Sequence, residues 1–553
     1  FTLRADGLSS FVALGVALFS LAVAVYSCSC RAKGPAKWFY FNLLMTLGFA
    51  SGAALADSMV TMLFFWEGLL VFLYTFIALS QDTPDAKRAA MKGFLINAVT
   101  DLCLLGGVAI TGYIAGTMSM SEISANKLTL DYGWAVFAYL LLATGAVSKA
   151  GAFPFHTWMP DAATSTSAPF MAYIPSSIDK LLGIYFLTRA SVYLFALDGG
   201  MQFVLMTLGA LTIIIAGAMA YVQNDARRLL TYSTVSQTGY LIMGIGTLNP
   251  VGIAGGLLHM ANHATYKSCL FMTAGAVERQ AGTNDLAKLG GLFRRMPVTG
   301  LCFLVAAVSI SGIAPLNGFF SKELIFRGTL ATGWTLFFLA AEVGSFLTLS
   351  SMLKMGHSVF FGERPAELGG VKEAPFGMLL PMLALAAVCV AFGFGADLPV
   401  QWFVSPALAA LGIPAGELAG FHANGLFWVS VIVVLAALAW HMLNLRGLGA
   451  ARVSDALRAA PGFKEIYDAA ERRVFDLYEL VMGKVVPAAA ELLFKADRFF
   501  DWVLDTAPSA SANALGGAVK RFHTGSYPLY MALTLAGTLA YLLLMVGGNG
   551  GLK

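Results

Sequence analysis

The sequence predicts an all-α protein that crosses a membrane many times, and three observations lead to this fold class. The 553-residue chain is 58% hydrophobic but only 12% charged, whereas roughly a quarter of the residues of a soluble domain are charged. Apolar segments recur at the length of about 20 residues that a helix needs to cross a bilayer. These segments do not alternate polar and apolar residues, as the strands of a membrane barrel do.

The apolar segments predict about 14 transmembrane helices. The candidate spans lie at 8–27, 38–57, 58–80, 91–115, 133–158, 169–192, 202–222, 229–247, 251–277, 298–330, 333–361, 374–395, 424–444 and 526–547. The basic loops fall on one side of this arrangement, at 31–37, 85–92, 224–228, 288–296 and 444–452. That side is expected to be cytoplasmic, because positively charged loops stay there.

Two of the spans contain a proline near a lysine. The first, TGAVSKAGAFPFHTW, holds Lys149 and Pro154, and the second, SGIAPLNGFFSKELIF, holds Pro315 and Lys322. Proline removes a helical hydrogen bond, and a membrane tolerates a broken helix where it lines a buried or water-filled cavity. Two such helices, five spans apart, predict two inverted five-helix repeats, since an odd number of helices turns the second copy upside down.

The chain is accordingly divided into six regions. They are an N-terminal helix at 1–37, a first repeat at 38–195, a second, inverted repeat at 202–361, additional transmembrane helices at 374–445, a lateral amphipathic helix at 462–506 and a C-terminal anchor helix at 526–547.

The region 462–506 differs from the rest because it carries frequent charges at helical spacing. Its apolar stripe has a period of three to four and consists of Tyr467, Val474, Tyr478, Val481 and Val485. We expect a helix that lies along the cytoplasmic membrane surface or against partner proteins. Pro487 is expected to kink it, and APSASANALGG (507–517) is expected to be a flexible link to the last span.

We single out nine ionisable residues inside the predicted spans, where a single one costs on the order of 2.5–3.5 kcal/mol. They are Glu67, Asp101, Lys149, Lys180, His259, His263, Lys267, Lys322 and Glu342. We expect them to face the protein interior and to meet one another or water. Burial and a nearby carboxylate act on the pKa of a lysine in opposite directions, which suits a group that loads and releases a proton. The set therefore predicts a proton path.

Other roles remain open for these residues. Glu67 could belong to a structural ion pair, and the lysines of the two broken helices could bind the carbonyls that the prolines free. His259, His263 and Lys267 share a helix face, so they could be buried packing or, for the two histidines, a metal pair. The adjacent lysine disfavours a cation there. We expect no metal or cofactor in this chain, because nucleotide-binding, haem and iron–sulfur patterns are absent from the sequence.

The motifs resemble those of the antiporter-like proton-pumping subunits of the complex I superfamily, above all the large distal subunit with its lateral helix. The resemblance covers nearly the whole chain and rests on FFWEGL (64–69), GAVSKAGAFPFHTWMPDA (145–162), NDARRLLTYSTVSQTGY (224–240), LLHMANHATYKSCLF (257–271) and APLNGFFSKELI (314–325). It implies that Glu67 is the key glutamate, Lys149 the central lysine and Lys322 the exit-side residue. It also implies two further helices upstream of Phe1.

The resemblance implies a proton-translocating subunit of a redox-driven pump, either a quinone oxidoreductase or a membrane-bound hydrogenase of the group 4 or formate hydrogenlyase type. Its partners would be other antiporter-like and small membrane subunits and a peripheral redox arm that holds iron–sulfur clusters, flavin or a nickel–iron centre. The complex would lie in the cytoplasmic (inner) membrane of a bacterium or archaeon.

One departure weakens the redox interpretation. Pro175 stands in AYIPSSIDKLLGIY (172–185), where the large complex I subunit usually has a histidine, and Lys180 follows five residues later. The alternatives are a structural membrane scaffold and an Mrp-type Na⁺/H⁺ antiporter subunit. The lateral helix favours the redox-driven pump over the antiporter, and the full set of buried ionisable residues disfavours the scaffold. The transported ion is expected to be H⁺, with Na⁺ left open.

Overall fold

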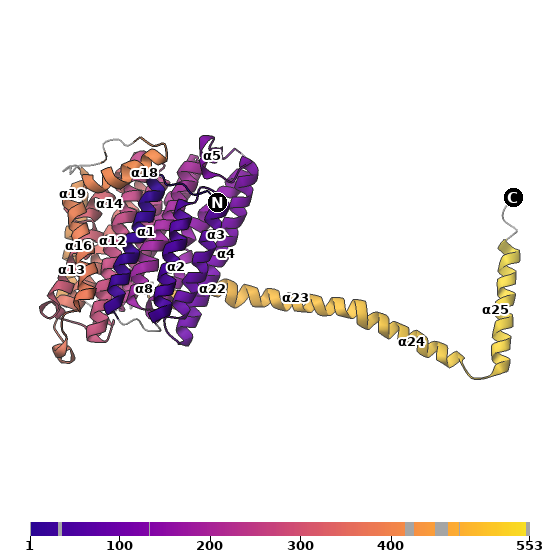
Figure 1. Cartoon of the computed structure of the whole chain (residues 1–553). Helices are drawn as coiled ribbons and strands as arrows, with labels where there is room; N and C mark the ends of the chain where they lie inside the picture. Colours follow the sequence, from indigo (N-terminus) through magenta and orange to yellow (C-terminus); the bar gives the residue numbers. More distant parts are fainter. Residues whose placement is uncertain are drawn as a thin grey trace. The chain divides into compact units, whose positions relative to one another are not determined.

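The computed structural model describes residues 2–30, 36–131, 133–414, 418, 425–447, 463–474 and 476–548. They form two compact units, which divide between Tyr478 and Glu479. Both units are helical (Figure 1). The described residues contain only two strands, β1 (Leu128–Thr129) and β2 (Phe195–Ala196), which pair in parallel. The all-α fold class is confirmed.

The first unit is a bundle of long helices. Its main helices are α1 (Gly7–Ser29), α2 (Ala36–Leu55), α3 (Met59–Ala78), α4 (Pro84–Ala115), α6 (Gly133–Ala150), α10 (Gly199–Val222), α11 (Ala226–Gly246), α12 (Pro250–Ala281), α13 (Pro297–Ser311), α14 (Asn317–Ala331), α15 (Thr335–Gly356), α16 (Phe376–Phe394) and α19 (Gly425–Gly447). Shorter helices join them, namely α5 (Met120–Ala125), α7 (Trp158–Ser165), α8 (Ala168–Tyr173), α9 (Asp179–Thr188), α17 (Asp397–Pro399) and α18 (Ser405–Ala410).

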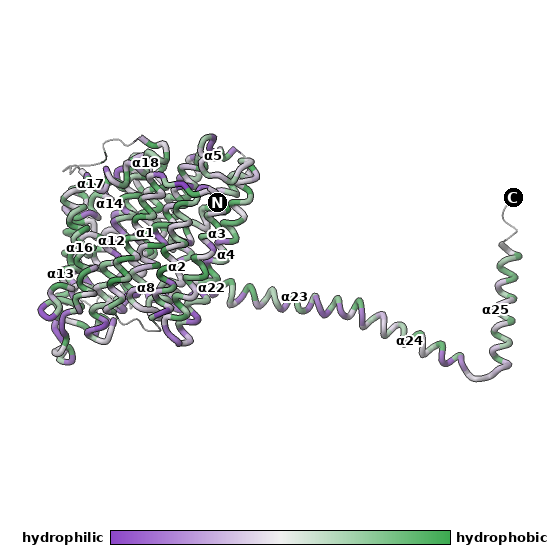
Figure 2. Tube along the Cα trace, viewed as in Figure 1, coloured by the Kyte–Doolittle hydropathy of each residue, from purple (hydrophilic) through white to green (hydrophobic). Residues whose placement is uncertain are grey.

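Within the described residues, ten helices are long and apolar enough to cross a membrane. Figure 2 shows hydrophobic residues along the bundle helices and hydrophilic residues gathered towards the connecting loops. The chain is therefore a multi-pass membrane protein. The count of about 14 spans stays a prediction, because several further helices are shorter or more polar than these ten.

The two longest helices, α4 and α12, have 32 residues each, and their ends follow from local sequence. Thr83 and Asn249 cap their first turns, each directly before a proline, which needs no N–H partner at that position. Gly116 and Gly282 end them in the left-handed conformation that glycine adopts without a Cβ clash. The basic stretch 85–92 was predicted as a loop and is instead helical, because the Thr83 cap starts α4 before it.

Both proline-containing spans are interrupted in the structure. α6 ends at Ala150, and Gly151 turns the chain at a φ of +68° towards α7. α13 ends at Ser311, and Gly312 turns it at +74° towards α14. The two breaks lie where the sequence predicted broken helices, and the inverted relation between the repeats remains a prediction.

The predicted lateral helix is interrupted near its start, which corrects the sequence prediction. In the first unit, α21 (Phe463–Glu471) ends in a turn at which Arg473 has a φ of +60°. α22 (Leu477–Leu480) follows this turn. A left-handed non-glycine residue cannot continue a right-handed helix, so the apolar stripe is divided between two segments. The first residue of the predicted range, 462, lies outside the described residues.

The second unit corrects a further prediction. It is helical through α23 (Val486–Asp501) and α24 (Ala507–Phe522), so 507–517 forms helix and not a flexible link. Alanine is frequent in this stretch and is the strongest helix former. Pro487 and Pro508 each stand two residues after the end of a π-helical segment, where the wider turn accommodates a residue without an N–H. α25 (Tyr527–Gly548) matches the predicted anchor helix.

Candidate functional site

Eight of the nine predicted ionisable residues are buried in the bundle. They are Asp101, Lys149, Lys180, His259, His263, Lys267, Lys322 and Glu342. Glu67 is the exception, because its side chain lies on the surface of this chain. The preceding residue, Trp66, points inward and is 1% exposed, and successive residues of a helix are about 100° apart around its axis. The prediction that Glu67 faces the interior of this chain is therefore wrong.

The first cluster joins α3, α4 and α6 around Asp101 and Lys149. The indole Nε1 of Trp66 donates to Asp101 Oδ1 at 2.9 Å, and Lys149 Nζ lies 5.5 Å from the centroid of the same indole. Asp101 Oδ2 is buried without a hydrogen-bond partner among the described residues. Beside the charges, the hydroxyl of Thr100 donates to Ser148 at 2.8 Å and fixes α4 against α6.

Small residues let α4 and α6 approach closely enough to form this cluster. A Cβ on Gly107 would lie 2.8 Å from the Leu142 side chain, and one on Gly145 would lie 2.7 Å from Leu104. Both distances are shorter than carbon atoms tolerate. The carboxylate of α4 and the lysine of α6 therefore meet in one place because glycine stands at these two positions.

The second cluster surrounds the break after α6. Lys180 Nζ lies 3.6 Å from the sulfur of Met159, and a Cβ on Gly151 would lie 3.1 Å from the same nitrogen. The neighbouring Asp179 is also buried, and its carboxylate is close enough to Lys149 and Lys180 to interact with both charges. Asp179 was not among the nine residues predicted from the sequence. The structure instead places it between the first two clusters.

The third cluster lies along α12. His259 shares hydrogen bonds with Ser321 at 2.9 Å, with Gln237 at 3.1 Å and with the Tyr266 hydroxyl at 3.2 Å. Both ring nitrogens of His263 are buried and, among the residues that the structure covers, have no hydrogen-bond partner.

Lys267 extends this face of α12 by one further turn. Its Nζ donates to the carbonyl oxygen of Leu230 on α11 at 3.1 Å. In the part of the chain that the structure describes, no group of three or more His, Cys, Asp or Glu side chains is arranged to hold a metal ion.

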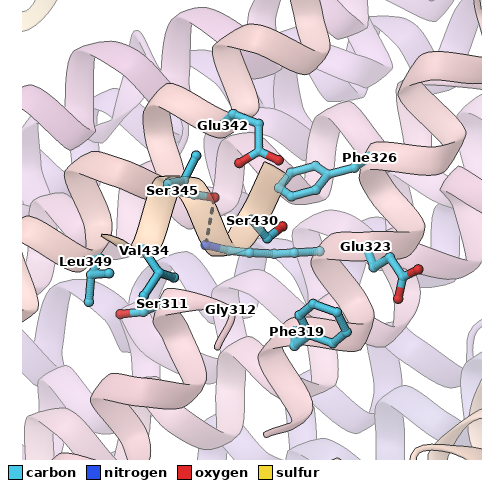
Figure 3. A pocket seen from close by; sticks show the side chains of 12 residues that line it. Ser311, Gly312, Phe319, Glu323, Phe326, Glu342, Ser345, Leu349, Ser430 and Val434 are labelled. Atoms are coloured by element: carbon cyan, nitrogen blue, oxygen red, sulfur yellow. Dashed lines mark hydrogen bonds between the residues drawn. The ribbon is translucent and has the colours of Figure 1, made fainter. Parts of the chain in front are cut away.

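The fourth cluster surrounds a small cavity beside the second break. Lys322 Nζ donates to the Ser345 hydroxyl at 3.3 Å. Glu342 lies one turn before Ser345 on α15, and both of its buried carboxylate oxygens have no hydrogen-bond partner among the described residues. Figure 3 shows the lysine reaching towards Ser345, with Glu342 on the same side of the cavity. The cavity is lined by Ser311, Gly312, Phe319, Lys322, Glu323, Phe326, Glu342, Ser345, Leu349, Ser430, Val433 and Val434.

These clusters can hold and pass protons. Each contains a lysine or histidine together with a carboxylate, hydroxyl or amide, and several polar atoms are buried without a partner in the described part of the chain, which in a polar cavity is where water binds. Sequence reasoning missed Trp66, Asp179 and Tyr240, whose ring centroid lies 4.8 Å from Lys322 Nζ. The signal for Trp66 was its place beside Glu67, since adjacent helix residues point in directions about 100° apart.

A separate ionic cluster, the root cluster, ties the start of the C-terminal amphipathic region to the bundle. Its members are Lys92, Asp161, Arg473 and Asp476. Lys92 is 3% exposed and pairs with both carboxylates, 3.0 Å from that of Asp161. Arg473 contacts Asp161 at 3.0 Å, and the Thr157 hydroxyl donates to Asp476 at 2.8 Å.

Comparisons with known proteins agree with this arrangement. Residues 56–348 match the family described as NADH:quinone oxidoreductase/Mrp antiporter, TM. The chain is 31% identical over 449 residues to the A1 subunit of the Na(+)/H(+) antiporter of Staphylococcus haemolyticus (strain JCSC1435), covering 76% of this chain and 56% of that protein. It is 29% identical over 437 residues to the A/B subunit of a "Probable K(+)/H(+) antiporter" of Rhizobium meliloti (strain 1021), covering 76% of this chain and 43% of that protein.

A solved structure also resembles the chain. The Mrp complex from Dietzia sp. DQ12-45-1b contains a chain with a TM-score of 0.76 and 26% sequence identity, and the match covers 94% of this chain and 56% of that one. The chain thus spans only a little over half the length of the Mrp chain, and the same holds for the A1 antiporter protein that it matches.

Proposed function

Because the chain belongs to the family of NADH:quinone oxidoreductase/Mrp antiporter membrane subunits, we propose that it translocates protons within a multi-subunit antiporter that exchanges them for a monovalent cation. The observation that carries the proposal is the series of buried clusters from Asp101 and Lys149 through Lys180 and the α12 histidines to Lys322 and Glu342. Buried ionisable residues in a membrane protein are retained mainly where they move ions or protons.

The relatives favour exchange over redox-driven pumping, which corrects the first interpretation of the sequence. They are named as subunits of Na⁺/H⁺ and K⁺/H⁺ antiporters, and the solved structure is that of an Mrp complex. The amphipathic C-terminal region had favoured a redox complex. A match that covers 94% of the chain extends past Tyr478, so that region does not separate the two classes. Hydrogenase chemistry and a peripheral redox arm have no support.

Glu67 has a place in this proposal despite its exposure. A carboxylate that faces lipid is costly, whereas one at a contact with a neighbouring membrane protein can meet a partner there. Other membrane subunits are expected from the Mrp complex. We place the complex in a bacterial cytoplasmic membrane, with the basic loops and the lateral helix on the cytoplasmic side.

The test is transport by the complete complex in proteoliposomes, without an electron donor. A Na⁺ or K⁺ gradient should drive a pH change inside the vesicles. Lys149→Met and Lys322→Met should each reduce this exchange at least tenfold, because a neutral side chain cannot load a proton. Lys127→Met is the matched control, since Lys127 is exposed on a loop. Wild-type exchange in both buried variants, or proton transport that needs an electron donor, contradicts the proposal.

A further inference from the structure

Each half of the bundle places an aromatic ring against its lysine. In the first half, Lys149 Nζ lies 5.5 Å from the centroid of Trp66, and in the second, Lys322 Nζ lies 4.8 Å from the centroid of Tyr240. Both rings are fully buried, at 1% and 0% exposure. An ammonium within about 6 Å of a ring centroid is attracted by the negative face of the ring, most strongly where water is excluded.

Both aromatic residues also bind the helix that carries the local carboxylate. Trp66 stands on α3 and donates its indole N–H to Asp101 on α4. Tyr240 stands on α11, and its hydroxyl donates to the Ala341 carbonyl oxygen at 2.5 Å and lies 3.1 Å from the Ser345 hydroxyl, both on α15. Since α15 also carries Glu342, each ring spans the space between a lysine and the helix of its carboxylate.

The lysines are held without a direct ion pair. Among the described residues, no carboxylate oxygen lies within 4 Å of the Nζ of either lysine, although other buried ion pairs of the chain meet this distance. The charged or titratable groups around Lys149 are Glu67, Asp101 and Asp179. Those around Lys322 are Glu342 and His259, and Glu323 lines the same cavity. A ring face thus lies against each ammonium group, no carboxylate of a described residue is in ion-pair contact with it, and Lys322 donates in addition to the Ser345 hydroxyl at 3.3 Å.

We propose that Trp66 and Tyr240 are positioning residues that hold the protonated forms of Lys149 and Lys322 away from Asp101 and Glu342. This inference rests on the proposed function and names two side chains that serve it. A buried ion pair is hard to separate, because either charge left alone is uncompensated. A cation on a ring face is held more weakly, so the lysine can give its proton to water or turn to the carboxylate without that barrier.

The proposal is tested by the pH dependence of exchange in the complete complex. Trp66→Leu and Tyr240→Leu remove the ring, and the alkaline limb of the pH profile should move to lower pH by about one unit, which corresponds to a tenfold weaker proton affinity of the lysine. Trp66→Phe and Tyr240→Phe keep a ring face but lose the hydrogen bonds, so they should keep most of the alkaline limb. If Trp66 and Tyr240 only supported the fold, the leucine variants would lower the exchange rate without moving the alkaline limb.

Exposed residues of the same types supply matched controls. Trp134 is 67% exposed and Tyr113 is 89% exposed, so Trp134→Leu and Tyr113→Leu should leave the profile unchanged. Leucine variants of Trp66 and Tyr240 with the wild-type alkaline limb overturn the proposal. Phenylalanine variants that shift as far as the leucine variants overturn it as well.

A spectroscopic measurement tests the contact without transport and without the leucine variants. The emission of Trp66, obtained as the difference between the wild-type complex and the Trp66→Phe complex, should change with pH as Lys149 titrates. Lys149→Met should abolish this change. If the difference emission does not respond to pH, or responds equally in Lys149→Met, the ring does not hold the ammonium. Failure of the antiporter proposal would appear separately, as a wild-type complex without cation-driven exchange.

Discussion

Single residues decide the shape of the two breaks. Gly151 and Gly312 have φ values of +68° and +74°, and each backbone faces a lysine directly. A Cβ on Gly312 would lie 2.8 Å from Lys322 Cδ, and one on Gly151 would lie 2.5 Å from Met159 Cε. Each break therefore requires glycine for two reasons. Glycine adopts the left-handed turn, and the absence of a Cβ leaves space for the neighbouring Met159 or Lys322 side chain.

The glycine requirement gives the first residue-scale prediction. Gly151→Ala and Gly312→Ala should lower the free energy of unfolding by about 2 kcal/mol or more, because a left-handed conformation costs roughly 1–2 kcal/mol for a residue with a Cβ and the clash adds to it. Exchange activity should fall as the lysines are displaced. Thermal unfolding in detergent and vesicle transport measure the two effects.

Gly116 is the matched control for this pair. Its φ is +70°, but a Cβ there would meet nothing within 4 Å. Gly116→Ala should therefore show only the conformational cost and normal exchange. Equal losses of activity in all three variants would mean that the space beside the lysines is unimportant.

A second residue-scale prediction concerns Asp6 and Arg189. Burial alone would raise the pKa of Asp6, but the charge and the hydrogen bond of Arg189, at 2.5 Å, leave it lower than the usual 3.8. A lowered folded-state pKa contributes stability above the unfolded-state pKa, and this stability is lost as the pH falls through the folded-state value. Asp6→Asn should lower the unfolding free energy at pH 7 by about 2 kcal/mol.

The pH dependence supplies the check on this prediction. The difference in unfolding temperature between the wild type and Asp6→Asn should shrink below about pH 4, where the wild-type carboxylate also loses its charge. Asp82→Asn is the control, because its salt bridge with Lys87 lies on the surface and such pairs contribute little. A difference that stays constant from pH 7 to pH 3 would refute the electrostatic cause.

At the scale of helices, sequence predicted positions along the chain better than directions around each helix. The two breaks and the burial of eight of the nine predicted ionisable residues follow from residue type and from the cost of a charge in hydrocarbon. The direction of Glu67 does not, because α3 is apolar on its lipid face and on its core face alike. Such a helix has no polar side to set its rotation, so only packing reveals that Trp66 points inward.

The secondary structure of the C-terminal region was also predicted incorrectly in part. The residues 507–517 contain serine, glycine and proline, which suggested a link, yet they form α24. The π-helical segment before Pro508 removes the conflict, and sequence periodicity does not reveal it. The root cluster was also unpredicted, because it joins Lys92 to residues almost 400 positions later.

At the scale of helices, we predict what happens when the root cluster loses one of its carboxylates. Asp476→Ala removes one carboxylate from buried Lys92 and leaves that of Asp161, so the loss should be about 1–3 kcal/mol. The turn after α21 should then be cleaved faster by trypsin, at Arg472 or Arg473. Glu491→Ala is the control, since its pair with Lys495 is 66–69% exposed. Equal cleavage rates in the wild type and Asp476→Ala would show that the cluster does not hold this turn.

At the scale of the whole molecule, the two units differ in how they bury their residues. The first unit holds the eight buried residues of the predicted proton path and the cavity beside Lys322. The second unit exposes large apolar side chains along α23, among them Leu492, Leu493, Phe494, Phe499 and Phe500, each at 59–69% exposure. Apolar patches of this kind on one chain mark contacts with other proteins or with lipid. We therefore expect the proposed translocation to belong to the first unit and contacts with partner subunits to belong to the second.

The last prediction separates these two tasks by removing Glu479–Lys553. The bundle should keep its helical content and its thermal midpoint, because the root cluster and the eight buried residues of the predicted proton path lie before Glu479. The partner membrane subunits should no longer copurify, since the apolar residues of α23 are lost with the unit. Phe499→Glu with Phe500→Glu should weaken copurification in the full-length chain, whereas Asp497→Ala should not.

Two outcomes would contradict this assignment of different functions to the two units. A truncated chain that still copurifies with all partners would show that the bundle alone makes the contacts. A truncated chain that loses its helical content would show that the second unit supports the fold. If copurification is lost while the bundle stays folded, the buried path is complete but isolated, and exchange should return when the full-length chain is supplied during assembly.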